Sequence, residues 1–439
     1  MYKTMSVFYE LNKGFVAFFI SILCFIYITG QLSDPYIRHD DWEFMTYLLP
    51  DMANHGTPWD KTLWEGRWTN YIWSFIARDF SVNANYLFFI LGYSLFCWSF
   101  AFSFTENKSH RILIAISAFF CPAYADLSLW PATLSPSVWI SAILLYLNYI
   151  YRKKYILLIT LPILVMSYAP LVAVCFLCVM VNEKSLFKDK FRWTFIYYIG
   201  YVIGVLIIHF LNYKYHDFFG VKIADWRNPN PVHSFSDLLD NIIKTAFFWK
   251  SVIVENGLFL IFTIALGFLS YLLGNKKKLF NIIFATFSIM ILESAMSVYT
   301  GVDVPVRSII WPWFFFVCIF AIGIQENNKY IKLFSLILWC VLFMQGSERW
   351  YGFYTYESKH SRFENVFGSI LRAQNERDIY ICGSIESIQG LGNRELRPLT
   401  LALWKKDGIF LKKAEDSECS TLINSIGLER KNNKLFYKL

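Results

Sequence analysis

The stretch "RHDDWEF", residues 38–44, gathers two adjacent carboxylates, an arginine and a histidine just after the first apolar run of the chain. A carboxylate can act as a general base, and a fixed cation can stabilise the negative charge that develops on a leaving group. We therefore take Asp40 and Asp41 as candidate catalytic residues. The flanking side chains Arg38, His39 and Glu43 are candidate substrate-binding residues.

Part of this stretch also fits a purely structural role. Asp40 can be the N-cap of a helix that opens at Trp42, with Glu43 three residues on, which is a variant of the capping box. The carboxylate of Asp41 would then not be used in capping and could act as the base. Which of the two aspartates is the base therefore depends on whether Asp40 caps the helix.

A second polar pattern lies in "DKTLWEGRWTNYIWSFIARD", about 60–79, which predicts a single helix. Placing residues every 100° gives this helix an aromatic face, as expected of a helix at the headgroup level, made of Trp64, Trp68, Tyr71, Ile72 and Phe75. The neighbouring stripe is polar and consists of Arg67, Asn70, Ser74 and Arg78. A lipid phosphate fits this stripe, and solvated charges on an interfacial helix are the alternative. We take Arg67 and Asn70 as substrate-binding candidates.

Two further arginines are candidates by position. Arg227 lies in the turn-rich "DWRNPNP", where Asp225 can also pair with it in a surface contact worth about 0–1 kcal/mol. Arg307 stands at the start of an apolar crossing, where a guanidinium can bind a phosphate bidentately or simply snorkel to the interface. Glu293 is costly inside an apolar helix and needs a partner, for which Arg307 or His209 is the candidate.

The elements that must position these groups are apolar helices. Of 439 residues, 56% are hydrophobic, 20% are aromatic and only 17% are charged, which indicates an integral membrane protein. Segments long enough to cross a bilayer recur at about 14–30, 84–104, 110–124, 136–151, 155–168, 170–182, 194–211, 257–274, 279–298, 306–324 and 329–346. We therefore expect an all-α polytopic membrane protein with about eleven transmembrane helices.

Charge decides how the segment 155–182 divides. Lysine and arginine collect on the cytoplasmic side of a membrane, so the basic runs at 152–155 and 184–192 should lie on one side. Two helices that meet at Ser167–Pro170 satisfy this condition, and one helix does not. The resulting odd count predicts a cytoplasmic amino terminus and an outer carboxyl-terminal region.

The outer loops, at about 31–83, 212–256 and 299–306, carry most of the aspartates of the membrane domain, which we place at 1–346. The formal charge of +8 follows from the cytoplasmic lysines and arginines, so we expect no nucleic-acid partner. Inner-membrane lipids are the surroundings that this pattern implies.

Residues 347–439 have a mixed, charged composition and are numerous enough for a small α/β periplasmic domain. We expect strands at 378–384 and 399–404, and we interpret the domain as an accessory cap over the membrane helices. Cys382 and Cys419 are the only cysteines of this region, and they can form a disulfide in an oxidising periplasm. The region has no glycine-rich phosphate loop and no zinc signature, and we predict neither a metal nor a cofactor.

The first loop, "DDWEF…EGRW" after one crossing, resembles that of the membrane glycosyltransferases of the GT-C type. With the basic cytoplasmic loops, the length and the outer tail, the chain looks most like the serotype-converting, phage-borne O-antigen glucosyltransferases of enteric bacteria. This resemblance implies a bacterial inner-membrane enzyme that moves glucose from undecaprenyl-phosphate-glucose to lipid-linked O-antigen units in the periplasm. It also implies that Asp40 and Asp41 are the acidic pair of the first loop.

Other functions fit the same composition. An O-antigen polymerase or ligase also binds polyprenyl-linked sugars, but it concentrates its chemistry in a large later loop. A transporter of polysaccharide or lipid-linked sugar should line its route with ionisable residues inside the spans, where Glu293 is nearly alone. In a purely structural membrane partner, "DDWEF" would be a helix cap and little else.

Overall fold

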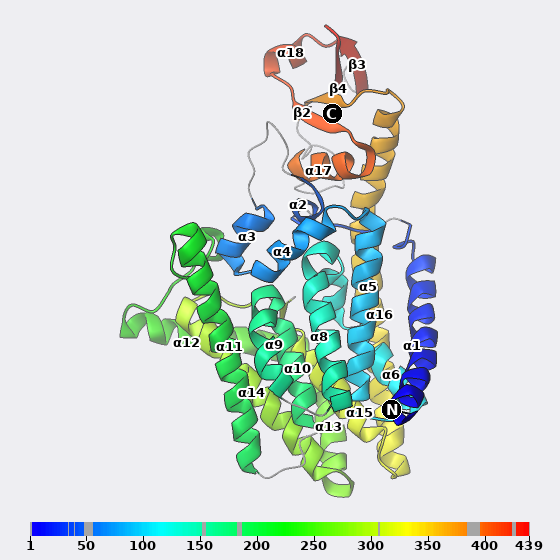
Figure 1. The fold of residues 1–439 in the computed structure, drawn as a ribbon, viewed down its shortest axis with the longest axis vertical. Coiled ribbons are helices and arrows are strands. Elements are labelled where there is room, and N and C mark those ends of the chain that lie inside the picture. Colours follow the sequence, from blue (N-terminus) through cyan, green and yellow to red (C-terminus); the bar gives the residue numbers. More distant parts are fainter. Residues whose placement is uncertain are drawn as a thin grey trace.

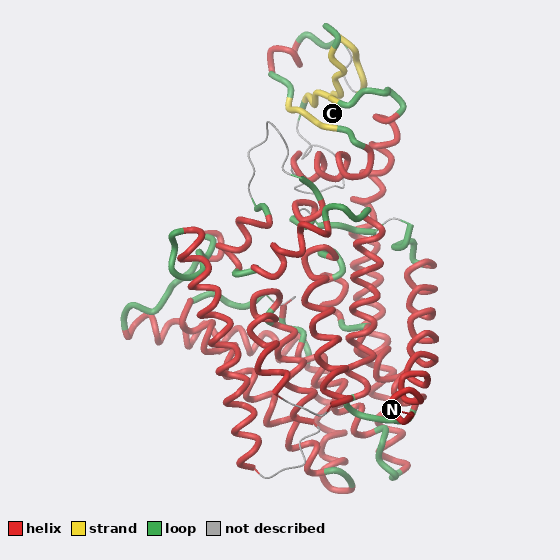
Figure 2. The backbone as a smooth tube through the Cα atoms, in the orientation of Figure 1, coloured by secondary structure: helices red, strands yellow, loops and turns green. Residues whose placement is uncertain are grey.

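The computed structural model describes residues 2–33, 35–38, 40–47, 56–151, 155–181, 187–305, 308–383, 396–423 and 427–438. Over these ranges the chain forms a bundle of helices that carries a small α/β domain at one end (Figure 1). We call this the domain end of the bundle. The tube in Figure 2 shows that strands occur in the small domain, whereas the bundle is drawn in helices and loops.

The first part of the bundle runs from the amino terminus through the first loop. Its helices are α1 (Tyr2–Ile28), α2 (Trp42–Met45), α3 (Pro58–Glu65), α4 (Trp68–Ala77), α5 (Val82–Phe102), α6 (Lys108–Phe119), α7 (Pro122–Leu127) and α8 (Pro131–Tyr151). The second part contains α9 (Tyr155–Tyr168), α10 (Pro170–Val181), α11 (Phe187–His216), the 3₁₀ helix η1 (Asp225–Arg227), α12 (Phe235–Glu255), α13 (Gly257–Leu273), α14 (Lys276–Thr300), α15 (Trp311–Gly323) and α16 (Lys329–Arg372).

The number of membrane-spanning helices is smaller than the sequence predicts. Five helices of the described chain are long and apolar enough to cross a membrane, namely α5, α8, α11, α14 and the first half of α16. A sixth is reached if α12 and α13, which meet at 77°, count as one broken span. The expected eleven is therefore wrong, because several apolar runs form helices shorter than a bilayer needs.

The segment 155–182 shows why the count fails. It does form two helices that meet near Pro170, as the charge pattern predicts. However, α9 has 14 residues and α10 has 12, which correspond to only about 21 and 18 Å of helix. The hydrocarbon core of a bilayer is about 30 Å thick, so neither helix is long enough to span it alone.

Charge is segregated along the bundle. The junction between α13 and α14, with Lys276 and its neighbours, and the start of α16 at Lys329 lie at the end opposite the domain (Figure 1). The short helices α2, α3 and α4 of the acidic first loop lie at the domain end (Figure 1). The bundle therefore has a basic end and an acidic end, the arrangement expected of a protein oriented across a membrane.

The predicted helix at 60–79 is broken in two. Gly66 has a left-handed conformation with φ +69° and ends α3, and α4 starts two residues later. A side chain at Gly66 would be strained and would also meet Ile208 of α11. The helix therefore turns where the backbone passes close to α11, and the aromatic residues expected on one continuous face are divided between two helices.

The last helix of the bundle continues into the small domain. With 44 residues, α16 is about 66 Å long, and it passes without a break through position 347, where the composition changes. Apolar residues of its carboxyl-terminal part, such as Phe367 and Leu371, pack into the core of the domain. Bundle and domain are thus joined by a continuous helix.

The domain consists of β1 (Asp378–Cys382), α17 (Leu396–Asp407), β2 (Phe410–Lys413), α18 (Asp416–Ser420), β3 (Gly427–Lys431) and β4 (Lys434–Lys438). Its sheet has the order β2-β1-β4-β3, in which β1 is parallel to both β2 and β4 and the β3–β4 hairpin is antiparallel. The expected strand at 378–384 is confirmed as β1, and Cys382 at its end forms a disulfide with Cys419.

The second expected strand, 399–404, is wrong, because this segment lies in α17. Leu399 and Leu403 of α17 face the sheet, whereas Leu401 and Ala402 pack against α2 of the first loop. A short helix that is buried on two sides has an almost unbroken apolar run, which periodicity alone cannot distinguish from a buried strand.

Candidate functional site

Asp41 is fully buried against the first turn of α8. Its two carboxylate oxygens accept hydrogen bonds from the backbone N–H groups of Ala132 and Thr133, at 2.9 and 2.7 Å. These N–H groups have no partner within α8, and a carboxylate is favoured at a helix N-terminus. Burial outweighs these hydrogen bonds and raises the pKa of Asp41 from 3.8 to about 7.

Asp40, which lies in the same turn of the chain as Asp41, is more accessible to solvent. Its side chain is 25% exposed, and one carboxylate oxygen lies 3.3 Å from Nζ of Lys61. Its other oxygen accepts a hydrogen bond from the indole N–H of Trp130. A carboxylate that is oriented by two donors and still accessible can receive a proton from a bound molecule.

The capping expectation for Asp40 is wrong. The N-cap of α2 is Asp41, and its side chain makes no capping hydrogen bond to that helix. Instead, the Asp41 side chain caps the N-terminus of α8, which lies some ninety residues further along the chain. Sequence spacing identifies caps of the next helix only, so this long-range contact could not be read from it.

The cluster around Asp40 continues along α3. Lys61 lies 2.8 Å from Glu65, and Glu65 lies 2.6 Å from a guanidinium nitrogen of Arg67. Burial raises the pKa of Glu65, but the charges of Arg67 and Lys61 outweigh burial and lower it. Asp40, Lys61, Glu65 and Arg67 therefore form a line of alternating charge, which we call the charged cluster.

Arg38 joins the charged cluster to α7. Its guanidinium lies 5.4 Å from the ring centroid of Trp130, in a cation–π contact, and 3.9 Å from the carboxylate of Asp126. Trp130 thus contacts Asp40 through its N–H and Arg38 through its ring. The structure brings together Arg38, Asp40 and Arg67 of the predicted site.

Other predicted residues have different surroundings. The carboxylate of Glu43 makes a bidentate pair with Arg397 of α17, at 2.6 and 2.9 Å. Asn70 is fully buried and hydrogen-bonds to Ser167, in the last turn of α9. Arg227 ends the 3₁₀ helix η1 in the loop between α11 and α12. His39 and Arg307 lie outside the described residues.

Glu293, the lone acidic residue predicted inside an apolar helix, has a partner that the sequence did not indicate. The indole N–H of Trp311, at the start of α15, donates a hydrogen bond of 2.7 Å to its carboxylate. This pair lies within the helical bundle and does not belong to the charged cluster.

A cavity of about 520 Å³ lies between α7, the bend from α12 to α13, the start of α15, and α16. Its polar lining comes from Asp126, Glu255, Asn256 and Arg349, and its apolar lining includes Val252, Ile309, Pro312 and Trp313. Asp126 belongs both to this cavity and to the ion pair with Arg38. The cavity is therefore adjacent to the charged cluster.

Sequence reasoning selected none of Asp126, Glu255, Asn256 and Arg349 as a site residue, and the cation among them is Arg349. It lies just beyond the apolar part of α16, in a segment whose changed composition assigned it to the carboxyl-terminal domain. The available signal was its place about one helical turn after the end of an apolar crossing, whereas Arg307 was selected by its place at the start of one. Among the described residues, no group of three or more His, Cys, Asp and Glu side chains is arranged to hold a metal ion.

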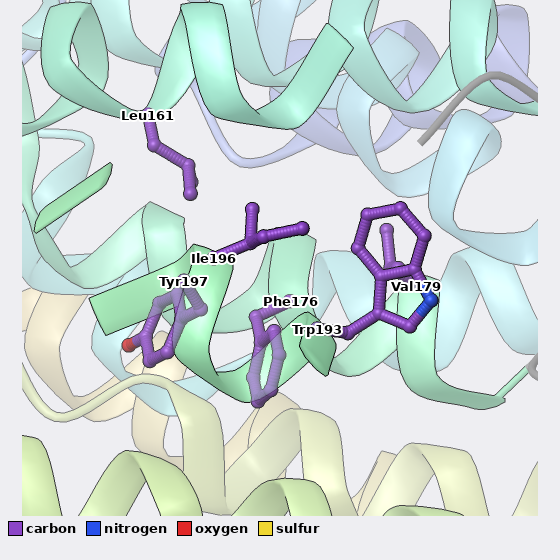
Figure 3. Close-up of a pocket in the computed structure, with 6 residues that line it drawn as sticks. All are labelled: Leu161, Phe176, Val179, Trp193, Ile196 and Tyr197. Atoms are coloured by element: carbon purple, nitrogen blue, oxygen red, sulfur yellow. The ribbon is translucent and has the colours of Figure 1, made fainter. Parts of the chain in front are cut away.

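The bundle also contains a second, much smaller void of about 10 Å³ between α9, α10 and α11. Figure 3 shows its lining, which is made of Leu161, Phe176, Val179, Trp193, Ile196 and Tyr197. These side chains are apolar apart from the phenol and indole edges, and the volume is about that of one water molecule. This void is a packing gap and offers no chemistry.

The chain has no match among protein-family models, curated proteins or solved structures.

Proposed function

We propose that this protein is a membrane glycosyltransferase. It moves a hexose from a polyprenyl-phosphate donor to O-antigen repeat units. The resemblance of its first loop indicates that this hexose is glucose. The observation that carries the proposal is a path of contacts from Asp40, an accessible and oriented carboxylate, through Trp130 and Arg38 to a large cavity that is lined by an arginine. Asp126 links the two, because it pairs with Arg38 and also lines the cavity.

The cavity suits an amphipathic ligand. Its apolar wall, with Trp313 and Ile309, would contact the isoprenoid next to the phosphate, and Arg349 would pair with the phosphate oxygens. The carboxylates of Asp126 and Glu255 can accept hydrogen bonds from sugar hydroxyls, and the amide of Asn256 can both accept and donate them. Arg349 thus takes the phosphate-binding role that positional reasoning gave to Arg227 and Arg307.

The chemistry then divides between the cavity and the charged cluster. As the acceptor hydroxyl attacks the anomeric carbon, Asp40 takes the hydroxyl proton and the new glycosidic bond forms. The bond between the anomeric carbon and the phosphate oxygen breaks, and the phosphate leaves with the electron pair. Arg349 stabilises the charge on that phosphate.

The two aspartates have different roles in this scheme. Asp41 is fully buried and its carboxylate is used by the N-terminus of α8, so it positions the turn that carries Asp40. Lys61 and Trp130 orient the Asp40 carboxylate. We therefore assign the proton transfer to Asp40 and a positioning role to Asp41.

Two observations support a periplasmic site. Disulfides persist in oxidising compartments, and the domain beside the charged cluster contains one between Cys382 and Cys419. Lysine-rich helix ends lie at the opposite end of the bundle (Figure 1). The chain would accordingly lie in a bacterial inner membrane, with its basic end in the cytoplasm and its carboxyl-terminal domain in the periplasm.

The test is a mass and linkage analysis of surface polysaccharide from a host that makes undecaprenyl-phosphate-glucose. The host expresses the wild-type chain, Asp40→Asn, or Asp225→Asn as a matched control in another loop. We expect a hexose branch with the wild type and the control and none with Asp40→Asn, at equal membrane abundance. A polysaccharide that changes in length or export without gaining a hexose contradicts the proposal and favours a polymerase, ligase or transporter.

A further inference from the structure

The turn that carries Asp40 and Asp41 is held from two sides. On the bundle side, Asp41 binds the N-terminus of α8. On the other side, α2 packs against the carboxyl-terminal domain, where Trp42, Phe44 and Met45 share a buried cluster with Leu401, Ala402 and Phe410. Residues more than 350 positions apart in the chain therefore form one core around α2.

The polar contact across this core is the pair between Glu43 and Arg397. Nε and one terminal nitrogen of the guanidinium contact the two carboxylate oxygens at 2.6 and 2.9 Å. The side chains are only 9% and 17% exposed. Because the pair is desolvated and bidentate, removal of either partner would leave an uncompensated charge inside the contact.

A second polar contact joins α17, the helix that contains Arg397, to the first loop. Nζ of Lys405, two turns after Arg397 in α17, donates a hydrogen bond to the backbone carbonyl of Arg78, just after α4. The next residue, Lys406, lies 5.6 Å from the ring centroid of Trp42. Thus α17 contacts the first loop near its beginning, at α2, and near its end.

These contacts carry an inference about the domain. We infer that Arg397 is a positioning residue, which holds the Asp40 carboxylate in place by fixing Glu43, three residues further along the same turn. The inference rests on the proposed function for the role of Asp40. It changes the interpretation of the carboxyl-terminal domain from an accessory cap to a part of the machinery that positions the reacting carboxylate.

The experiment compares full-length chains purified in lipid nanodiscs. Arg397→Ala removes the bidentate contact, Arg397→Lys keeps the charge without the planar fork, and Arg430→Ala is the matched control. Arg430 lies in the same domain and pairs at 2.6 Å with Glu376, but that pair is more exposed, at 55% and 37%. Two quantities are measured: hydrogen exchange of peptides that span Asp41–Tyr47, and the kcat and KM of hexose transfer.

We expect Arg397→Ala to speed exchange of this segment and to lower kcat by about 10²-fold, because an error of about 1 Å at a reacting group costs that much. The KM for the lipid donor stays within about twofold of the wild type, since the cavity lies outside this contact. Arg397→Lys recovers part of kcat, and Arg430→Ala behaves as the wild type. If Arg397→Ala does not fold, the isosteric Glu43→Gln is measured in its place, with the same expectations.

Two results overturn the inference. One is unchanged exchange of this segment in Arg397→Ala, or in Glu43→Gln where it is measured in place of that variant. The other is faster exchange in the same variant with an unchanged kcat. A wild-type chain without any hexose transfer refutes the proposed function and, with it, the catalytic consequence drawn for Arg397. The exchange data then still decide separately whether Arg397 holds the turn, so the two failures are distinguishable.

Discussion

The two sides of the helical bundle differ in how much space they enclose and in whether charged side chains line it. Between α9, α10 and α11 the side chains leave a void of only about 10 Å³ with an apolar lining. Between α7, the end of α12, the start of α15 and α16 they leave a cavity of about 520 Å³, whose lining includes two carboxylates and an arginine. Charged groups are costly in an apolar interior, so they gather where water or a ligand can reach them.

The same contrast recurs on a smaller scale between neighbouring residues. Asp41 faces the packed side, where both of its oxygens are used by backbone N–H groups of α8. Asp40 faces the open side, beside Lys61 and Trp130. Under the proposed function, we expect the open regions to carry the chemistry and the packed regions to carry the stability.

The largest effect is expected on the open side, at Asp40. Asp40→Asn keeps the size of the side chain but removes the base, so hexose transfer should fall by about 10²–10⁴-fold with an unchanged melting temperature. The measurement is the single-turnover rate of the purified chain, with Asp225→Asn as control. A loss of less than tenfold would remove Asp40 from the reaction.

The next effect concerns the cavity. Arg349→Ala should raise the KM for the polyprenyl-phosphate donor by about 10–100-fold, because a hydrogen bond to a charged group is worth about 1.5–3 kcal/mol. Arg362→Ala, an exposed arginine of the same helix, is the control and should leave KM within twofold. Equal effects of the two substitutions would mean that the cavity does not bind the donor phosphate.

On the packed side, Asp41→Ala should act on stability. It leaves the N–H groups of Ala132 and Thr133 without their acceptor, which costs about 1–3 kcal/mol for a buried group. We expect a lower melting temperature and lower membrane abundance, while the folded fraction retains its KM for the donor. A variant of full stability that is inactive would instead make Asp41 the base.

A pair of glycines extends the comparison to packing. A Cβ atom at Gly204 would lie 2.7 Å from Cβ of Val165, so Gly204→Ala should destabilise the chain by about 1–3 kcal/mol. At Gly352, which lines the cavity, a Cβ atom meets nothing within 4 Å. Gly352→Ala should therefore stabilise α16 by about 0.5–1 kcal/mol. Thermal unfolding in detergent measures both, and equal shifts would contradict the difference in packing.

The smallest effect is a pH dependence caused by Asp41. Because burial raises its pKa from 3.8 to about 7, the folded chain holds this proton more tightly than the unfolded chain does. The contribution to stability is therefore complete below about pH 4 and is lost as the pH rises toward 7. The difference in melting temperature between the wild type and Asp41→Asn should shrink or reverse over this range. A difference that stays constant with pH would show that Asp41 does not titrate there.

The sequence predicted the helical, membrane-associated character and the acidic first loop, because composition and local spacing determine them. It identified Cys382 and Cys419 as a possible disulfide pair but did not decide whether the bond forms, and the structure shows that it does. It did not predict the break at Gly66 or the helix α17, since close approach to Ile208 and burial between α2 and the sheet are tertiary effects. The roles of Asp41 and Arg349 were hidden for the same reason. One binds a helix far along the chain, and the other lines a cavity built from four separate segments.

The central claim is tested most directly with purified chain in proteoliposomes that contain a polyprenyl-phosphate-hexose and a lipid-linked O-antigen acceptor. Mass spectrometry follows the acceptor and the released polyprenyl phosphate together. We predict one hexose gained by the acceptor for each polyprenyl phosphate released, and neither product with Asp40→Asn. Donor that stays intact while acceptor units are joined to one another or moved across the bilayer would contradict the account.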